Sequence, residues 1–183
     1  MSLFRIAGVD PSLSNFGMVK MDLNIETMTF DVIAFKLVET DKQTSKQVRQ
    51  NSDDLRRSRQ IYKAFQEFVA DCSIVFAEIP SGAQSARAAL AFGVSVGLVA
   101  SCPKPVIQVQ PFETKMATIG TKTASKEEMI IWASQAYPDA PWLRTAKGKI
   151  LNKNEHLADA IAIGHAGIVT DQFVQLLSMR KVA

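Results

Sequence analysis

The stretch LFRIAGVDPSLSNFG, Leu3 to Gly17, sets the beginning of the fold. It starts with a mostly apolar run and stops at Asp10-Pro11. Because proline cannot donate a hydrogen bond to a neighbouring strand, the run predicts a strand that ends beside Asp10. Open α/β sheets build their sites at the C-terminal ends of their strands. Asp10 is therefore the first candidate site residue.

The residues that follow predict an antiparallel meander and then a helix. Residues 17–21 and 27–38 are further strand candidates, and residues 22–26 connect them. From Asn51 to about Ala70 the apolar residues recur at helical spacing, with Ser52 or Asp53 as a candidate cap.

The rest of the chain alternates strands with helices. The predicted elements are a buried strand at 73–77, a helix at 83–101, a short strand at 106–109, a helix at 125–136, a loop at 138–153, a helix from about Glu155 to Gly167 and a short helix to Met179. This order predicts the α/β class, with a mixed five-stranded sheet and helices on both of its faces.

Composition favours one soluble domain over residues 1–183. Apolar residues make up 47% of the chain and charged residues 21%, as is typical of globular proteins. The longest apolar stretch, Ala88 to Cys102, is shorter than the roughly 20 residues of a membrane span. With no apolar targeting segment and two cysteines without paired spacing, we expect a cytoplasmic protein with reduced thiols and no membrane partner.

The acidic residues predict a metal site. Asp10 and Glu78 each follow a buried strand, and Asp159 lies three residues after His156, on the same face of the last helix. Clustered carboxylates repel one another unless a cation neutralises them. Oxygen ligands favour Mg²⁺ or Mn²⁺, and two such ions can stabilise both the attacking and the leaving oxygen of a phosphodiester displacement.

Each acidic residue also has a plainer interpretation. Asp10 before proline could be a turn residue, and Asp159 could face solvent, although its apolar neighbours make an unpaired charge there costly. His156 could be an ordinary helix-end histidine. Glu155 is a first-turn charge near a helix N-terminus, and the sequence assigns it no further role.

Basic residues provide candidate DNA contacts. The net charge is +3, but residues 36–63 alone hold eight basic and four acidic side chains. A solvated helix face is the alternative to a phosphate-binding surface. The candidate contacts are Arg56, Arg57, Arg59, Lys122, Lys126, Lys147, Lys149 and Lys153.

Several motifs, in order, resemble RuvC-type Holliday junction resolvases over nearly the whole chain. Residues 8–17 resemble the family's opening motif, residues 74–78 its strand ending in a catalytic glutamate, and residues 156–162 its closing motif. Residues 53–65, 86–99, 110–115 and 124–129 resemble the intervening helices and strand exit.

The resemblance implies an RNase H-like, metal-dependent endonuclease that cuts branched DNA, in a form similar to resolvases carried by bacteriophages. It makes Asp10, Glu78 and Asp159 ligands of two Mg²⁺ ions, which Mn²⁺ can replace, with His156 as a fourth ligand or a proton-transfer residue. It also implies a homodimer formed through the helix at 83–101. The face expected there consists of Ala88, Ala89, Phe92, Val96 and Val99.

Two segments depart from the family pattern. Resolvases usually carry an aromatic residue shortly after the catalytic glutamate, where this chain has Ile79-Pro80-Ser81-Gly82. Residues 37–50 are longer than the usual connection, and the sequence assigns them no role.

Three other functions are compatible with parts of the sequence. An RNase H-type nuclease acting on RNA–DNA hybrids would use the same carboxylates. A non-catalytic DNA-binding recombination module would not need them. A sugar-kinase-like ATPase domain shares the opening strand and aspartate, but the sequence shows no second phosphate-binding glycine loop.

Overall fold

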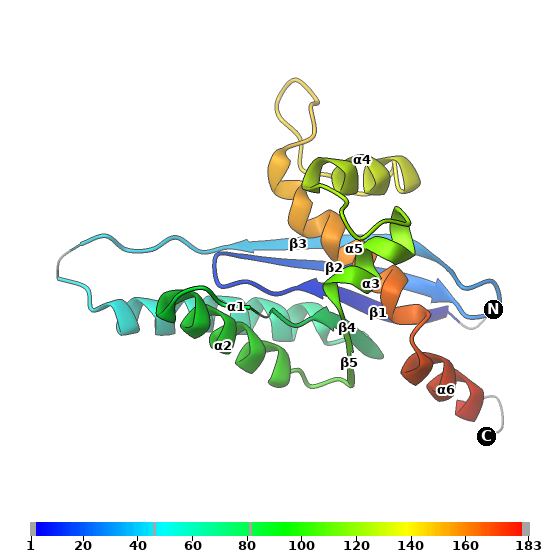
Figure 1. Cartoon of the computed structure of the whole chain (residues 1–183), viewed down its shortest axis with the longest axis horizontal. Helices are drawn as coiled ribbons and strands as arrows, with labels where there is room; N and C mark the ends of the chain where they lie inside the picture. The colour runs from blue at the N-terminus through cyan, green and yellow to red at the C-terminus, as the bar shows by residue number, and fades with distance from the viewer. Residues whose placement is uncertain (1–2, 46, 81, 181–183) are drawn as a thin grey trace.

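The computed structural model of the chain describes residues 3–45, 47–80 and 82–180. A five-stranded sheet of order β3-β2-β1-β4-β5 forms its centre (Figure 1). The first three strands are antiparallel, whereas β4 and β5 run parallel to β1. The strands are β1 (Leu3–Asp10), β2 (Asn15–Asn24), β3 (Thr29–Glu39), β4 (Ile74–Glu78) and β5 (Val106–Val109).

Helices cover both faces of the sheet, which confirms the predicted fold class. They are α1 (Gln50–Val69), α2 (Ala86–Ala100), α3 (Pro111–Thr118), α4 (Lys126–Ala136), α5 (Glu155–Ile168), preceded by the short 3₁₀ helix η1 (Asn152–Asn154), and α6 (Asp171–Arg180). Helices α1 and α2 lie on one side of the sheet, and α5 crosses the other beneath α4 (Figure 1).

The alternation of side chains along β1 separates two cores. Ile6 belongs to the core shared with α5, whereas Ala7 and Val9 belong to the core shared with α1 and α2. This is the period of two expected of a strand covered on both faces. Both sides of β1 are therefore shielded from water up to Asp10.

Two glycines bring α5 unusually close to the sheet. A Cβ atom at Gly8 would collide with the backbone carbonyl of Ala160, and one at Gly17 would collide with that of His156. The absence of side chains at these two positions lets the helix backbone rest directly on β1 and β2. The first turns of α5 consequently lie above the end of β1 that carries Asp10.

Several predicted element boundaries are wrong. Strand β2 continues to Asn24, so part of the predicted 22–26 connection belongs to the strand. Neither Ser52 nor Asp53 caps α1, because that helix already begins at Gln50. Helix α2 begins at Ala86, three residues later than predicted, with Ser85 as its cap.

Helix α3 is absent from the prediction. Its first residue is Pro111, which can occupy the first turn of a helix because the N–H group it lacks would have no partner there. Gln110 and Glu113 form a capping box around it. The sequence did not predict this helix, because a proline just after a strand indicates the end of that strand equally well.

The segment that the sequence analysis left without a role joins β3 to α1. Its beginning is held in place, because the hydroxyl of Thr40 donates to the carbonyl of Leu13 and the backbone N–H of Gln43 donates to the carboxylate of Asp53. The segment therefore braces the loop that follows Asp10.

No single helix in the described part of the chain is long and apolar enough to cross a membrane; residues 152–168 and 171–179 pass that test only as a pair bent by 58°.

Candidate active site

Two strand ends place Asp10 and Glu78 side by side. Strands β1 and β4 are parallel neighbours in which Val9 pairs with Ala77, so the next residue of each strand is a carboxylate. Both side chains emerge at the C-terminal edge of the sheet, as the sequence predicts. This is the edge where α/β folds place their ligands.

Helix α5 adds the other two predicted residues. The Nδ1 atom of His156 lies 2.7 Å from an Asp10 carboxylate oxygen, and both side chains are about four-fifths buried, with 17% and 21% of their surface accessible. On its other side, the Nε2 atom of His156 lies 3.4 Å from the Glu155 carboxylate. The imidazole therefore bridges two carboxylates from different elements.

Burial and mutual repulsion alter the acidity of the site. Burial, reinforced by the nearby charge of Asp10, raises the pKa of Glu78 to about 7. Burial, with the charges of Asp10 and Glu78, raises the pKa of Asp159 to about 7 as well. Two of the three carboxylates thus resist ionisation at neutral pH in the absence of a cation.

The pKa of His156 shifts in the opposite sense to that of a simply buried histidine. Burial alone would lower it, but the hydrogen bond with Asp10 and the charges of Asp10, Glu155 and Asp159 raise the pKa above its usual value. His156 is therefore well suited to carry a proton beside Asp10.

The sequence analysis missed two residues of α3 that belong to this site. The hydroxyl of Thr114 donates to the Glu78 carboxylate over 3.4 Å, and the charge of Lys115 lowers the pKa of Glu78 and so opposes the effect of burial. Both residues lie on α3. The sequence signal that could have revealed them is the capping box of Gln110 and Glu113, which marks the start of this helix. Thr114 is buried, and its hydroxyl is shared between Glu78 and the carbonyl of Gln110, which lies 3.2 Å away.

The side chains at this site are of the chemical types that bind a hard divalent cation. Three carboxylates and an imidazole converge, and a bound Mg²⁺ or Mn²⁺ would relieve the repulsion that raises the two carboxyl pKa values. Within residues 3–45, 47–80 and 82–180, no group of three or more His, Cys, Asp or Glu side chains is already arranged to hold a metal ion.

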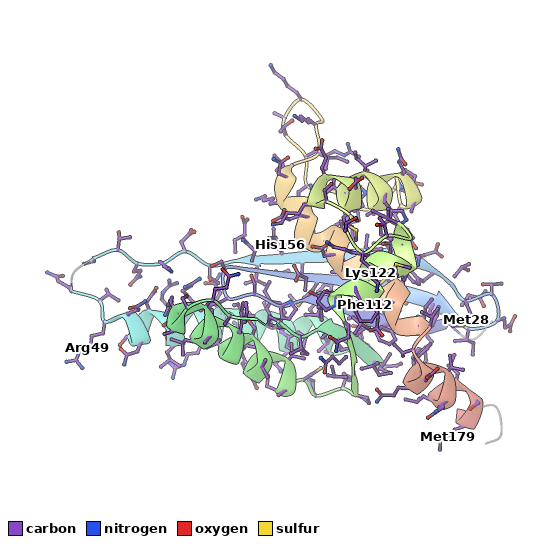
Figure 2. All side chains as sticks on the ribbon, viewed as in Figure 1. Met28, Arg49, Phe112, Lys122, His156 and Met179 are labelled. Carbon is purple, nitrogen blue, oxygen red and sulfur yellow. The ribbon has the colours of Figure 1, made fainter. Side chains whose placement is uncertain are left out.

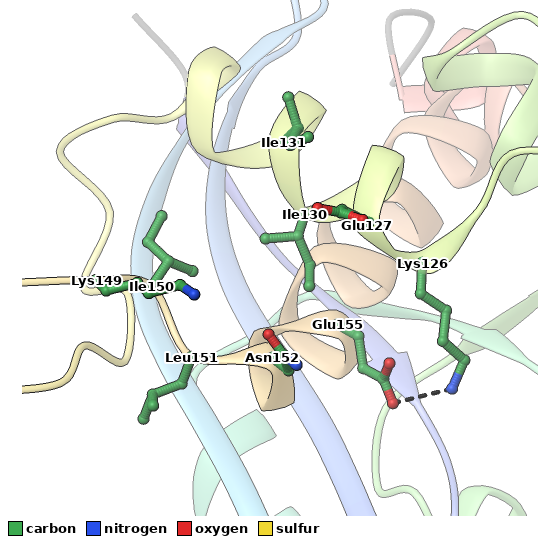
Figure 3. A pocket seen from close by; sticks show the side chains of 9 residues that line it. All are labelled: Lys126, Glu127, Ile130, Ile131, Lys149, Ile150, Leu151, Asn152 and Glu155. Atoms are coloured by element: carbon green, nitrogen blue, oxygen red, sulfur yellow. Dashed lines mark hydrogen bonds and ion pairs between the residues drawn. The ribbon is translucent and has the colours of Figure 1, made fainter.

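A pocket lined by two lysines and two glutamates adjoins the site. It has a volume of about 550 Å³ and lies between α4 and the segment that leads into α5 (Figure 3). Lys126 and Lys149 line it, and the Nζ atom of Lys126 lies 3.0 Å from the Glu155 carboxylate. Because Glu155 also contacts His156, this pocket is connected to the candidate active site through a single side chain.

Most of the other predicted DNA contacts reach solvent. Arg59, Lys122 and Lys147 are exposed. Arg56 is also exposed but is paired with Asp53, and the half-buried Lys153 is paired with Glu39 over 2.9 Å.

Arg57 does not fit its predicted role as a phosphate contact. It is 1% exposed, and its guanidinium donates to the hydroxyls of Thr40 and Ser14 over 2.9 Å and to the carbonyl of Leu13. Its charge lies beside that of Asp54, at 3.8 Å. Arg57 is an internal anchor for the loop after Asp10.

Helix α2 presents a partly exposed apolar face. Ala89, Leu90 and Val96 are exposed and Phe92 is half-buried, whereas Val99, predicted to share this face, is buried against the core. The outward face is therefore shifted toward Leu90.

Comparisons with known proteins bear on the fold. No family model matches the chain, and no curated protein matches its sequence. Among solved structures, RuvC of Thermus thermophilus in complex with a Holliday junction is similar at a TM-score of 0.67 and 20% identity, with 96% of each chain covered. The Fowlpox virus resolvase bound to Holliday junction DNA is similar at a TM-score of 0.56 and 18% identity, with 95% of this chain and 99% of that one covered.

A third similar structure comes from yeast. Its mitochondrial Holliday junction resolvase matches at a TM-score of 0.52 and 12% identity, over 98% of this chain and 84% of that one. These likenesses show that the chain has the RNase H-like fold of the RuvC-type resolvases.

Proposed function

We propose that this protein is a metal-dependent endonuclease that cuts Holliday junctions and other branched DNA. The observation that carries the proposal is the convergence of Asp10, Glu78, His156 and Asp159 at one sheet edge, with two carboxyl pKa values raised to about 7. The similar folds are those of junction resolvases, two of them bound to junction DNA.

The four side chains divide the work of the proposed reaction. Asp10, Glu78 and Asp159 would hold Mg²⁺ or Mn²⁺, with His156 as a further ligand or as the group that carries a proton. When bound, two such ions activate a water molecule and stabilise the leaving oxygen of a phosphodiester.

Substrate binding would rest on the basic residues around the site. Lysine and arginine contacts to phosphates supply most sequence-independent DNA affinity. Lys126 and Lys149 line the pocket beside Glu155, and Lys122 and Lys147 are exposed nearby in sequence. These lysines would guide a strand toward the carboxylates.

We further propose that the protein acts as a homodimer joined through α2. A four-way junction has two-fold symmetry, and two nuclease sites related by the same symmetry could nick opposed strands. The exposed apolar residues of α2 support this assembly, because they would be buried between two copies of the helix.

The missing aromatic residue after Glu78 supports a broad choice of branched substrates. Ile79 and Pro80 cannot stack on a base, and Ser81 lies outside the described residues. We therefore expect three-way junctions, forks and flaps to be cut alongside four-way junctions.

The decisive experiment compares labelled four-way, three-way, flap and linear DNA with an RNA–DNA hybrid, all with Mg²⁺. Glu78→Gln serves as the inactive variant. Asp139→Asn is the matched control, because Asp139 is an exposed carboxylate on the loop after α4. We expect wild type and Asp139→Asn to cut branched DNA, and Glu78→Gln not to cut it. Preferential cutting of the hybrid would favour the RNase H alternative, and no cutting at all would favour the non-catalytic module.

A further inference from the structure

Phe112 is the one phenylalanine with an exposed side chain in the described part of the chain; 49% of its surface is accessible. It is the second residue of α3 and follows three residues after Val109, the strand partner of Glu78. An exposed phenyl ring forgoes the stabilisation that burial would give, and its face suits stacking against another flat ring.

A cation stands beside this ring. The Nζ atom of Lys122 lies 5.4 Å from the centroid of the Phe112 ring (Figure 2). Met116, one turn further along α3, is also exposed and extends the apolar surface. An exposed aromatic ring with a lysine next to it is the combination that proteins use to bind unpaired nucleotides, with the base on the ring and the phosphate on the cation.

The position of Phe112 relative to the carboxylates follows from α3. Thr114, which contacts Glu78, lies two residues further along and thus on nearly the opposite side of the helix. A helix with its side chains is about 10 Å across. The ring therefore lies across α3 from the Thr114–Glu78 contact.

We propose that Phe112 and Lys122 form a binding subsite for an unpaired base of the DNA substrate and its phosphate. The inference rests on the proposed function and deepens it, since it names a stacking residue on α3 that would take an unpaired base from any branched substrate, in keeping with the broad substrate choice. When DNA binds, the ammonium group of Lys122 leaves the Phe112 ring and pairs with the phosphate. This is favourable because an exposed cation–π contact is weaker than base stacking combined with phosphate pairing. Other aromatic candidates are less suitable: Phe16 is fully buried against Phe65.

Binding measured in chelator tests this subsite without cleavage. The probes are four-way and three-way junctions with 2-aminopurine at the branch point, compared with a linear duplex of the same sequence. For Phe112→Ala we expect about 5- to 100-fold weaker binding of the junctions and loss of the 2-aminopurine quenching, with little change for the duplex. Phe112→Trp should retain both signals, because it preserves a stacking face.

Two further variants sharpen the test. Tyr62→Ala removes an equally exposed ring, 48% accessible, from α1 and should leave quenching unchanged. Lys122→Ala should weaken binding to every DNA and reduce the salt dependence by about one phosphate contact.

The outcomes separate the two proposals. If wild type binds and cuts junctions but Phe112→Ala binds and quenches as wild type does, only the subsite is overturned. Equal losses caused by Phe112→Ala on junctions and on linear duplex would overturn it too, because stacking on an unpaired base cannot explain them. If wild type neither binds nor cuts branched DNA, the proposed function fails as well.

Discussion

The repulsion within the carboxylate cluster predicts that Asp159→Asn stabilises the metal-free protein. The pKa of Asp159 is about 7 in the folded chain, against a usual value of 3.8. At 1.36 kcal/mol per unit, holding this carboxylate ionised costs up to about 4 kcal/mol at pH 8. Solvent screening and the buried amide of asparagine reduce the expected gain to about 2 kcal/mol.

This gain should depend on pH in one direction. Because the folded pKa is raised, the folded state of wild type binds more protons than the unfolded state between about pH 4 and 7, so its stability increases as pH falls through that window. The difference between variant and wild type should therefore be largest at pH 8 and shrink toward pH 4. Urea unfolding in EDTA over this range measures it.

A control of opposite sign is available in Asp71. Lys20 and Arg5 hold its pKa down to about 2, so Asp71→Asn should remove a favourable interaction and lower the free energy of unfolding slightly. An Asp159→Asn protein that is less stable than wild type at pH 8, or a difference that does not vary with pH, would refute the repulsion argument.

Three more predictions follow from the proposed chemistry. Asp10→Asn and Glu78→Gln should each abolish cutting while DNA binding persists, as gel-shift and cleavage assays on one junction would reveal; a variant cutting at nearly the wild-type rate would remove that residue from the site. Mg²⁺ or Mn²⁺ should support cleavage and Ca²⁺ mainly binding, since its looser coordination misplaces the nucleophile; strong activity in chelator would contradict a metal mechanism. Val96→Asp on the exposed face of α2 should give a monomer by light scattering and abolish paired nicking; a wild type that is strictly monomeric yet nicks both strands would rule out the dimer.

Periodicity predicted the architecture because it reports directly on burial. The apolar run of β1 and the helical spacing in α1 both reflect which side chains face a core, and both elements lie where predicted. The same reasoning placed Asp10 and Glu78 at one edge, because parallel neighbouring strands end together.

Features set by tertiary contacts could not be predicted in this way. Arg57 has the sequence context of a surface arginine between Arg56 and Arg59, yet hydrogen-bond partners from two distant segments, Leu13-Ser14 and Thr40, hold it inside. Helix α3 is eight residues long, too short for a periodic signal, and so Thr114 was missed with it.

The backbone contact between α5 and the strands has a consequence for how this protein can vary. Where a helix rests on a sheet through side chains, each change of side-chain size alters their separation. Here Gly8 and Gly17 meet main-chain carbonyls, so the separation is fixed by atoms that every amino acid shares. The surrounding core can exchange one apolar residue for another without moving His156 relative to Asp10. Two positions without side chains thus allow wide sequence divergence around a constant arrangement of the proposed catalytic groups.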